Sequence, residues 1–274
     1  MKKVLLLMIP ALLIGFAGCK KDKKDDGGDN SGKTTTTKPV QNVMMFYFGG
    51  TWCGPCGAYG KPTIQAAKKI NERVHVVSCQ VNGAGGATDP FNNAHSTQLA
   101  GVFSVKGVPT LFIADGNGQI ASFSGGASMQ SSTTTKVNEI LSKTDPDVYA
   151  KPVVKLDGDN ITVTINAQFY KDFSDEYRFA VYITESRLQA NQYQDGRTED
   201  KNMHDDVLRL SLTTEVVGDV VASSVTKGTK ISKTYTGTLD ANWKKENLKA
   251  VVVFWRKTGD NQVTFVNGEY TKIK

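Results

Sequence analysis

The sequence predicts an α/β domain with a mixed sheet over residues 39–145, followed by an all-β sandwich over residues 150–274. In the first part, apolar runs of strand length alternate with stretches of helical pattern. In the second part, short runs alternate between apolar and polar residues with period two, and turn signals separate them. At 274 residues, the chain is long enough for two such domains, each with its own core.

The expected order of elements in the first domain is βαβαββα. Strands are predicted over residues 43–48, 74–81, 110–114 and 120–124. Helices are predicted from about residue 53 to 71, from 89 to 100 and from 131 to 143. Pro62 predicts a kink in the first helix. The Asp89-Pro90 pair predicts the N-cap and first position of the second.

The sequence WCGPC at residues 52–56 directly follows the first predicted strand. Its two cysteines stand at the strand-to-helix junction, where they can close a small disulfide. Cys53 would lie at the positive end of the helix, which stabilises a thiolate. Cys53 is therefore the predicted attacking sulfur, and Cys56, one helical turn on, is the predicted resolving sulfur.

A second motif, GVPT at residues 107–110, precedes another apolar run. Together and in this order, the two motifs resemble those of thioredoxins. The resemblance implies that the bond between Val108 and Pro109 is cis, that this pair faces the cysteines, and that it contacts substrate together with Trp52. Thioredoxins carry a buried carboxylate six positions before the first cysteine, where this chain has Tyr47.

A glycine-rich insert at residues 82–91 also separates this domain from a plain thioredoxin. The insert could border the site and shape substrate access, or it could be a passive loop. The passive loop is the simpler interpretation.

A zinc site is the main alternative for a Cys-x-x-Cys pair. His75 and Cys79 have a spacing that could supply two further ligands. On a strand, however, both would point to one face of a packed sheet. Cys79 is then expected to be a buried small hydrophobe, and His75 a surface or hydrogen-bonded histidine. The sequence predicts no metal and no other cofactor.

The N-terminus carries export and anchoring signals. Two lysines precede an apolar stretch at residues 4–17, which is too short to span a membrane comfortably. The sequence FAGC at 16–19 resembles a lipobox, so residues 1–18 are the predicted signal peptide and Cys19 the predicted lipidation site. An ordinary signal peptide with an incidental thiol is the alternative. Residues 19–38 are predicted to be a disordered tether, with an average reach of roughly 25 Å.

The second domain contains about seven strand-like runs, which predict an antiparallel sandwich of immunoglobulin type. The clearest runs are residues 161–165, 179–184, 207–212, 231–236, 250–255 and 263–266. The longest stretch without strand character, residues 186–205, is predicted to be a polar loop. His204 could act there with Asp205, Asp206 and Glu199 in metal binding or acid–base chemistry, but solvated loop residues are the simpler interpretation. No catalytic constellation is predicted in this domain.

Taken whole, the chain resembles the 28-kilodalton outer-membrane protein family, Gram-negative lipoproteins that join a thioredoxin-like domain to a β-sandwich. The lipobox, the two thioredoxin-type motifs and the segment at residues 182–209 carry the resemblance. It implies a lipid anchor in the outer membrane, on the periplasmic or the surface-exposed face. Members of the family are described both as redox proteins and as surface receptors or adhesins.

The leading prediction is a membrane-anchored thiol–disulfide oxidoreductase that acts on envelope or extracellular proteins, with an unknown electron donor or acceptor. Gly54-Pro55 resembles the dipeptide of reducing thioredoxins, whose potential is about −270 mV against about −120 mV for strong oxidants. The direction of electron flow is left open. The alternative is a surface-exposed binding or adhesin-type lipoprotein whose cysteine pair is only structural. Formal net charge is +6 without a dense basic block, which argues against nucleic acid as a partner.

Overall fold

The structure is a computed structural model that describes residues 39–114, 118–258 and 262–274. The predicted signal peptide (1–18), lipidation site Cys19 and tether (19–38) lie outside the described residues. No helix within the described ranges is long and apolar enough to cross a membrane.

The N-terminal region, residues 39–145, has the predicted βαβαββα order. Its strands are β1 (Val43–Gly49), β2 (Val74–Gln80), β3 (Thr110–Ala114) and β4 (Ile120–Ser124), and its helices are α1 (Lys61–Ile70), α2 (Ala94–Val102) and α3 (Ser128–Leu141). β1 pairs parallel with β2 and antiparallel with β3, and β3 pairs antiparallel with β4. This mixed sheet is thioredoxin-like, which confirms the prediction for this region.

β1 is apolar throughout because a different layer covers each of its faces. Every residue of the strand is buried. Phe46 and Phe48 enter a core that also contains residues of the C-terminal region. Met45 and Tyr47 enter a separate core that contains residues of α1 and α3. A strand covered in this way needs apolar side chains at consecutive positions.

The predicted first helix begins with an irregular turn. η1 (Cys56–Gly60) is a π-type turn, in which the amide of Lys61 donates to the carbonyl of Cys56. Pro62 has no amide hydrogen, so it cannot donate to the carbonyl of Ala58 one turn earlier. The irregularity that Pro62 predicts is therefore a wide turn next to the second cysteine, and such turns recur at functional sites.

The second helix begins later than predicted. Its N-cap is Asn93, whose side chain accepts a hydrogen bond from the amide of Ser96 (3.0 Å). The carboxylate of Asp89 instead accepts from the amide of Thr51 (2.7 Å), 38 positions earlier. The prediction of an N-cap at Asp89 is wrong because Asp89 begins a separate turn, in which the amide of Asn92 donates to its carbonyl (3.1 Å), and the helix starts only after Asn93.

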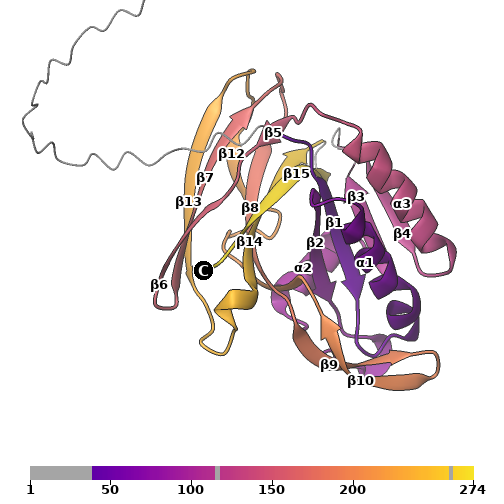
Figure 1. Cartoon of the computed structure of the whole chain (residues 1–274). Coiled ribbons are helices and arrows are strands. Elements are labelled where there is room, and N and C mark those ends of the chain that lie inside the picture. The colour runs from indigo at the N-terminus through magenta and orange to yellow at the C-terminus, as the bar shows by residue number, and fades with distance from the viewer. Residues whose placement is uncertain (1–38, 115–117, 259–261) are drawn as a thin grey trace, which may run out of the picture. The chain divides into compact units, whose positions relative to one another are not determined.

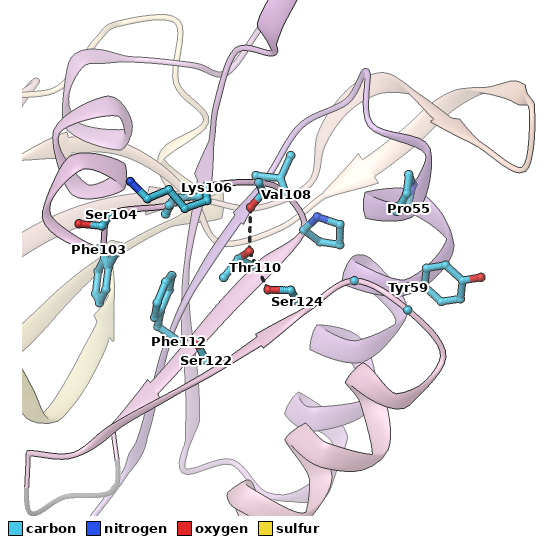
Figure 2. Close-up of a pocket in the computed structure, with 15 residues that line it drawn as sticks. Pro55, Tyr59, Phe103, Ser104, Lys106, Val108, Thr110, Phe112, Ser122 and Ser124 are labelled. Carbon is cyan, nitrogen blue, oxygen red and sulfur yellow. Dashed lines mark hydrogen bonds between the residues drawn. The ribbon is translucent and has the colours of Figure 1, made fainter.

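The β3–β4 hairpin has the predicted bounds, and a cis bond between Val108 and Pro109 precedes it. Figure 2 shows this end of the hairpin. The Thr110 hydroxyl donates to the carbonyl of Gly107 (2.7 Å) and lies 3.4 Å from the hydroxyl of Ser124 on β4. These contacts hold the segment before β3 against the end of the sheet.

The C-terminal region, residues 146–274, is built from strands. They are β5 (Val148–Tyr149), β6 (Val153–Asp157), β7 (Asn160–Phe169), β8 (Tyr177–Glu185), β9 (Leu188–Gln194), β10 (Arg197–His204), β11 (Val207–Ser211), β12 (Asp219–Ala222), β13 (Lys230–Thr238), β14 (Leu248–Lys257) and β15 (Val263–Lys272). The sequence predicts β7, β8, β11, β13, β14 and β15. The strands that it misses are short, polar or both.

Five of these strands continue the thioredoxin-like sheet. The strand order is β15-β14-β8-β11-β2-β1-β3-β4, with β12 beside β8, so one nine-stranded sheet runs through both regions (Figure 1). The junction is a parallel pair between β11 and β2, where Val207 faces Ser78. The amide of Ser78 also donates to the carbonyl of Asp206 (2.8 Å). The regions that the sequence suggests as two domains therefore share a sheet and one of their cores.

A second sheet, β13-β7-β5 with β6 beside β7, packs against β8 and β14. Alternate residues of β7, such as Ile161 and Val163, enter one core with Phe179 and Val181 of β8. The C-terminal region thus adds further β-sheets to the thioredoxin-like part. That they form a sandwich of immunoglobulin type remains a prediction.

The predicted loop at residues 186–205 is instead a β-hairpin. β9 and β10 form a separate two-stranded sheet. Asp195 and Gly196 connect them with φ angles of +50° and +76°, as expected of a tight Asp-Gly turn. The loop prediction is wrong because alternation between apolar and polar residues is weak in this hairpin. Its inward face contacts polar backbone groups of another segment and no apolar core.

Candidate active site

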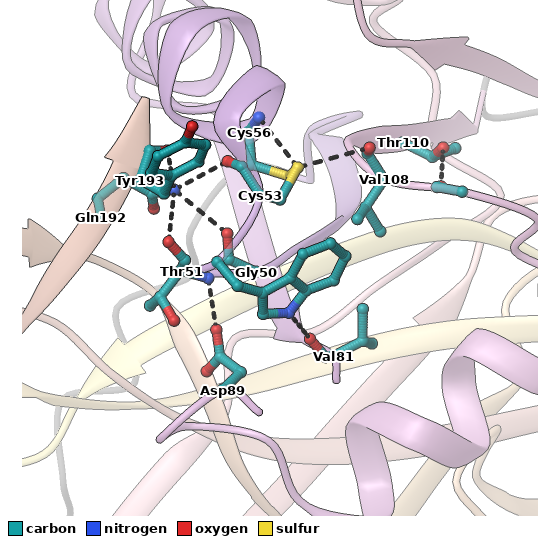
Figure 3. The surroundings of a disulfide bond; sticks show 12 residues. Gly50, Thr51, Cys53, Cys56, Val81, Asp89, Val108, Thr110, Gln192 and Tyr193 are labelled. Carbon is teal, nitrogen blue, oxygen red and sulfur yellow. Dashed lines mark hydrogen bonds between the residues drawn. A yellow bond between two sulfur atoms is a disulfide. The ribbon is translucent and has the colours of Figure 1, made fainter. Parts of the chain in front are cut away.

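Cys53 and Cys56 form a disulfide where β1 gives way to the first helix, with Cα atoms 5.2 Å apart. Figure 3 shows its surroundings. The amide of Cys56 lies 3.2 Å from the sulfur of Cys53 and points at it. This amide at the helix start, which also donates to the carbonyl of Cys53 (3.1 Å), is a group that would stabilise a thiolate at this sulfur after reduction. Both residues are nearly buried, with 4% and 1% of their surfaces exposed.

The structure brings the predicted proline motif to the cysteine pair. The sulfur of Cys53 lies 3.5 Å from the carbonyl oxygen of Val108, and Pro109 follows in the cis peptide. Residues 53 and 108 are far apart in the chain, so this contact comes from the pairing of β1 with β3. The predicted geometry of a redox pair facing a cis-proline is therefore present.

Trp52 is held by the residue after β2 and by the glycine-rich insert that follows. Its indole nitrogen donates to the carbonyl of Val81 (2.9 Å). At Gly83, a Cβ atom would lie 2.9 Å from the Trp52 ring, so the insert backbone packs closely against the indole. Trp52 therefore lies beside the disulfide as predicted, and the insert borders the site, which the passive-loop interpretation did not expect.

Asp89 is a site residue that sequence reasoning misses. Its carboxylate, on a residue only 6% exposed, accepts hydrogen bonds from the amides of Thr51 (2.7 Å) and Phe91 (2.8 Å). Burial raises the pKa of this carboxyl, while the hydrogen bonds act in the opposite direction. Asp89 fixes the turn two residues before Cys53. The position of the thioredoxin carboxylate is occupied by Tyr47, whose pKa is raised by burial and by the charge of Asp89.

The β9–β10 hairpin supplies further contacts that the sequence does not reveal. The side-chain amide nitrogen of Gln192 donates to the carbonyls of Gly50 (3.2 Å), Thr51 (3.2 Å) and Cys53 (3.1 Å). The backbone amide of Tyr193 donates to the carbonyl of Thr51 (2.7 Å). The C-terminal region thus contributes directly to the environment of the disulfide (Figure 3).

A groove of about 550 Å³ opens beside the proline motif. Pro55 and Tyr59, from the helix that follows Cys53, line it together with Val108 and Pro109. Figure 2 shows Pro55, Tyr59 and Val108 around it. At the far end, the rings of Phe103 and Phe112 stack with centroids 4.6 Å apart. The groove therefore offers apolar surface beside Val108, whose carbonyl faces the sulfur of Cys53.

The other candidate residues do not form a metal site. No group of three or more His, Cys, Asp or Glu residues in the described part of the chain could hold a metal ion. Cys79 is a free, fully buried thiol, in agreement with its prediction as a small hydrophobe. His75 is buried 3.5 Å from Glu269, and burial lowers its pKa.

The prediction that His204 and Asp206 are solvated loop residues is wrong. Both are 2% exposed, because β10 lies against the N-terminal region. Burial and the charge of Lys61 lower the pKa of His204 to about 4. Asp206 pairs with Lys68 and Lys249. The two ion pairs of Asp206 link the residue before β11 to α1 and β14 and stabilise the junction between the two regions.

Comparison with known proteins places the chain in a family. The family model described as outer membrane protein Omp28 matches residues 96–272, more than half of the chain. The chain belongs to the Omp28 family. The matched residues begin after Cys53 and Cys56, so membership of the family gives no information about the cysteine pair. No curated protein matches the sequence.

Solved structures resemble this Omp28 family member over most of its length. HBP35 of Porphyromonas gingivalis is 16% identical with a TM-score of 0.68, and the likeness covers 85% of this chain and 76% of that one. Protein AGR_C_4864 of Agrobacterium tumefaciens is 12% identical with a TM-score of 0.52, covering 85% of this chain and 95% of that one. At these identities the likeness shows the shared fold alone and gives no information about activity.

Proposed function

We propose that the protein is a thiol–disulfide oxidoreductase that acts on proteins of the cell envelope or the extracellular space. The observation that carries the proposal is the disulfide of Cys53 and Cys56 at a helix start, with the sulfur of Cys53 3.5 Å from the Val108 carbonyl. A bridge with a purely structural role has no need of this proline segment or of the groove beside it.

The chemistry follows from the geometry of the pair. In the reduced protein, the Cys53 thiolate attacks one sulfur of a substrate disulfide. The substrate S–S bond breaks, a mixed disulfide forms, and the other substrate sulfur leaves as a thiolate that takes a proton from water. The Cys56 thiolate then attacks the Cys53 sulfur and releases the second substrate thiol. Two electrons pass from the protein dithiol to the substrate, and the same steps run backwards when the protein is the oxidant.

Substrates would reach Cys53 along the groove. An extended segment next to a cysteine could lie against Val108 and Pro109, with its apolar side chains near Tyr59. Trp52, fixed by the insert, would cover the other side of the reacting sulfurs. Repeated turnover requires an external dithiol or disulfide to restore the cysteine pair, and this partner is an unidentified envelope component.

We further propose that the protein acts at the outer membrane. Membership of the Omp28 family supports this site of action. In this proposal residues 1–18 are removed as a signal peptide, Cys19 carries the lipid, and residues 19–38 tether the folded region on the periplasmic or the surface-exposed face. Nucleic acid is not a proposed partner, because positive charge is not concentrated in any block of the sequence.

The second candidate function is a surface binding or adhesin-type lipoprotein with a structural cysteine pair. The burial of both cysteines favours it, since 4% and 1% exposure leaves little sulfur surface for a partner. In that case the ligand would contact the added β-sheets, and the disulfide would serve to fix the turn before the first helix.

Replacing Cys53 by serine separates the two functions. The wild-type chain is expected to accelerate the reduction of insulin by dithiothreitol, whereas Cys53→Ser falls to the uncatalysed rate because the attacking sulfur is gone. Cys79→Ala is the matched control, since it removes a thiol that is fully buried and unpaired. It is expected to keep the wild-type rate. Equal rates for wild type and Cys53→Ser would refute the oxidoreductase proposal.

A further inference from the structure

One side chain of the C-terminal region adds a hydrogen-bond donor to the carbonyl groups around Cys53. Gln192, on β9, is 1% exposed. Its amide nitrogen lies 3.0–3.2 Å from four carbonyl oxygens, those of Gly50, Thr51, Cys53 and its own neighbour Tyr193. An amide group carries only two hydrogens, so these oxygens share both donors, and none of the donor capacity is left for water.

Glycines allow the hairpin to approach the redox turn this closely. A Cβ atom at Gly57 would lie 2.6 Å from the Cβ of Gln194 and 2.9 Å from the carbonyl oxygen of Tyr193. At Gly54, a Cβ atom would make an ordinary contact with the Tyr193 ring at 3.4 Å. The second strand of the hairpin is held as well, because the ammonium of Lys61 donates to the carbonyl of Met203 (2.8 Å).

The electrostatic consequence concerns the sulfur of Cys53. Carbonyl oxygens carry partial negative charge, and three of them belong to the turn that ends at this cysteine. Each of the three already accepts at least one backbone amide, from Cys53, Tyr193 and Cys56 respectively. The field that remains would disfavour a thiolate in a site from which water is largely excluded. The Gln192 amide places its positive end among them and offsets that field.

We propose that Gln192 is a positioning residue of the redox turn, which clamps three carbonyl groups beside Cys53 and so favours its thiolate. This inference rests on the proposed function for its significance, since a thiolate matters only if the pair reacts. It gives the C-terminal region a role in the chemistry: the Omp28-type β-structure completes the thioredoxin-like site through one hairpin.

The test is the pH profile of Cys53 alkylation by iodoacetamide in the reduced full chain, followed by mass spectrometry of the modified cysteine. The variant is Gln192→Glu, which keeps the shape of the side chain but replaces the two-hydrogen amide donor by a carboxyl oxygen. Gln189→Glu is the matched control, because it makes the same change at an exposed position of the same strand. The midpoint of the profile reports thiolate stability, whereas its plateau reports access of the reagent.

Gln192→Glu is expected to move the midpoint upward by about one pH unit, since a carboxyl group, whether charged or protonated, offers fewer donors to these carbonyl oxygens than the amide does. Gln189→Glu is expected to leave the midpoint unchanged. If Gln192→Glu does not fold, judged by circular dichroism, Gln192→Met removes the donors without adding charge and is expected to shift the midpoint in the same direction. An unchanged midpoint in a folded Gln192 variant would overturn the inference, whatever happens to the plateau.

This outcome is independent of the insulin assay. A shifted midpoint in a chain that reduces no disulfide would leave the Gln192 role standing and remove the proposed function. If the wild type catalyses insulin reduction but the Gln192 variants keep the wild-type midpoint, the proposed function stands and the Gln192 role is removed.

Discussion

Replacing Phe46 by alanine is expected to lower the free energy of unfolding by about 4 kcal/mol. Phe46 is fully buried on β1. Its ring packs against Tyr182, Trp255 and Phe265 of the C-terminal region, with centroids 5.0–5.9 Å apart. The substitution leaves a cavity at the place where both regions meet.

Urea unfolding measures this effect, with tryptophan fluorescence and circular dichroism followed together. Because the core is shared, both probes are expected to report one transition at a lower midpoint. Val153→Ala, at a residue 60% exposed on β6, is the control and is expected to change stability by less than about 0.5 kcal/mol. Two separate transitions, with only the first one shifted by Phe46→Ala, would contradict the shared core.

Asp206→Asn is expected to cost about 3 kcal/mol of folding free energy. Asp206 is 2% exposed and pairs with Lys68 from α1 and with Lys249 from β14 (2.5 Å for the latter). Asparagine keeps the shape but leaves two ammonium groups without their carboxylate. The side chains of these lysines are 31% and 20% exposed, so water can partly rehydrate them, which keeps the cost at the lower end of the range for broken buried pairs.

The same pair of lysines gives the effect a pH dependence. Burial disfavours the charged carboxylate of Asp206, but Lys249 and Lys68 outweigh it and hold the pKa below its usual value. A carboxyl with a depressed folded-state pKa contributes stability above its unfolded pKa of about 4 and loses it as pH falls through the folded value. The difference between wild type and Asp206→Asn is therefore expected to be largest near neutral pH and to shrink in acid.

Urea midpoints at pH 7 and pH 3 measure this dependence. Asp205→Asn serves as the control, because Asp205 is the exposed neighbour and has no ion pair with either lysine. A loss of stability that is equal at both pH values would show that the ion pairs do not carry the effect.

The cysteine pair, the proline motif and the core strands of the N-terminal region could be predicted because their signals are local. Cys53 and Cys56 are three residues apart, and a run such as 43–48 shows its burial in its own composition. The cis bond at Pro109 follows only from resemblance, since proline alone leaves the isomer open.

Contacts across the chain left no such local signal. Gln192 is one polar residue in a polar stretch, and its partner Cys53 is 139 positions away. Asp89 gave a misleading local signal, because Asp-Pro reads as a helix start while its carboxylate bonds to Thr51. The Asp195-Gly196 turn was a usable signal for the β9–β10 hairpin. The residues on either side of it alternate only weakly between apolar and polar, so the two strands are not predicted.

The pairing of β11 with β2 could not be predicted from the sequence either. Val207 and Ser78 meet at a single register position, and both strands have the apolar character expected of a separate sheet. Only the three-dimensional arrangement shows that one sheet joins the two regions and brings the hairpin to the disulfide.

The central claim is that Cys53 attacks protein disulfides, and a mixed-disulfide trap in the native host tests it most directly. Cys56→Ala leaves Cys53 able to attack but removes the sulfur that releases the substrate. The account predicts covalent partners on non-reducing gels with Cys56→Ala and none with Cys53→Ala. A folded, expressed Cys56→Ala variant without adducts would contradict the redox role and favour a binding protein with a structural disulfide.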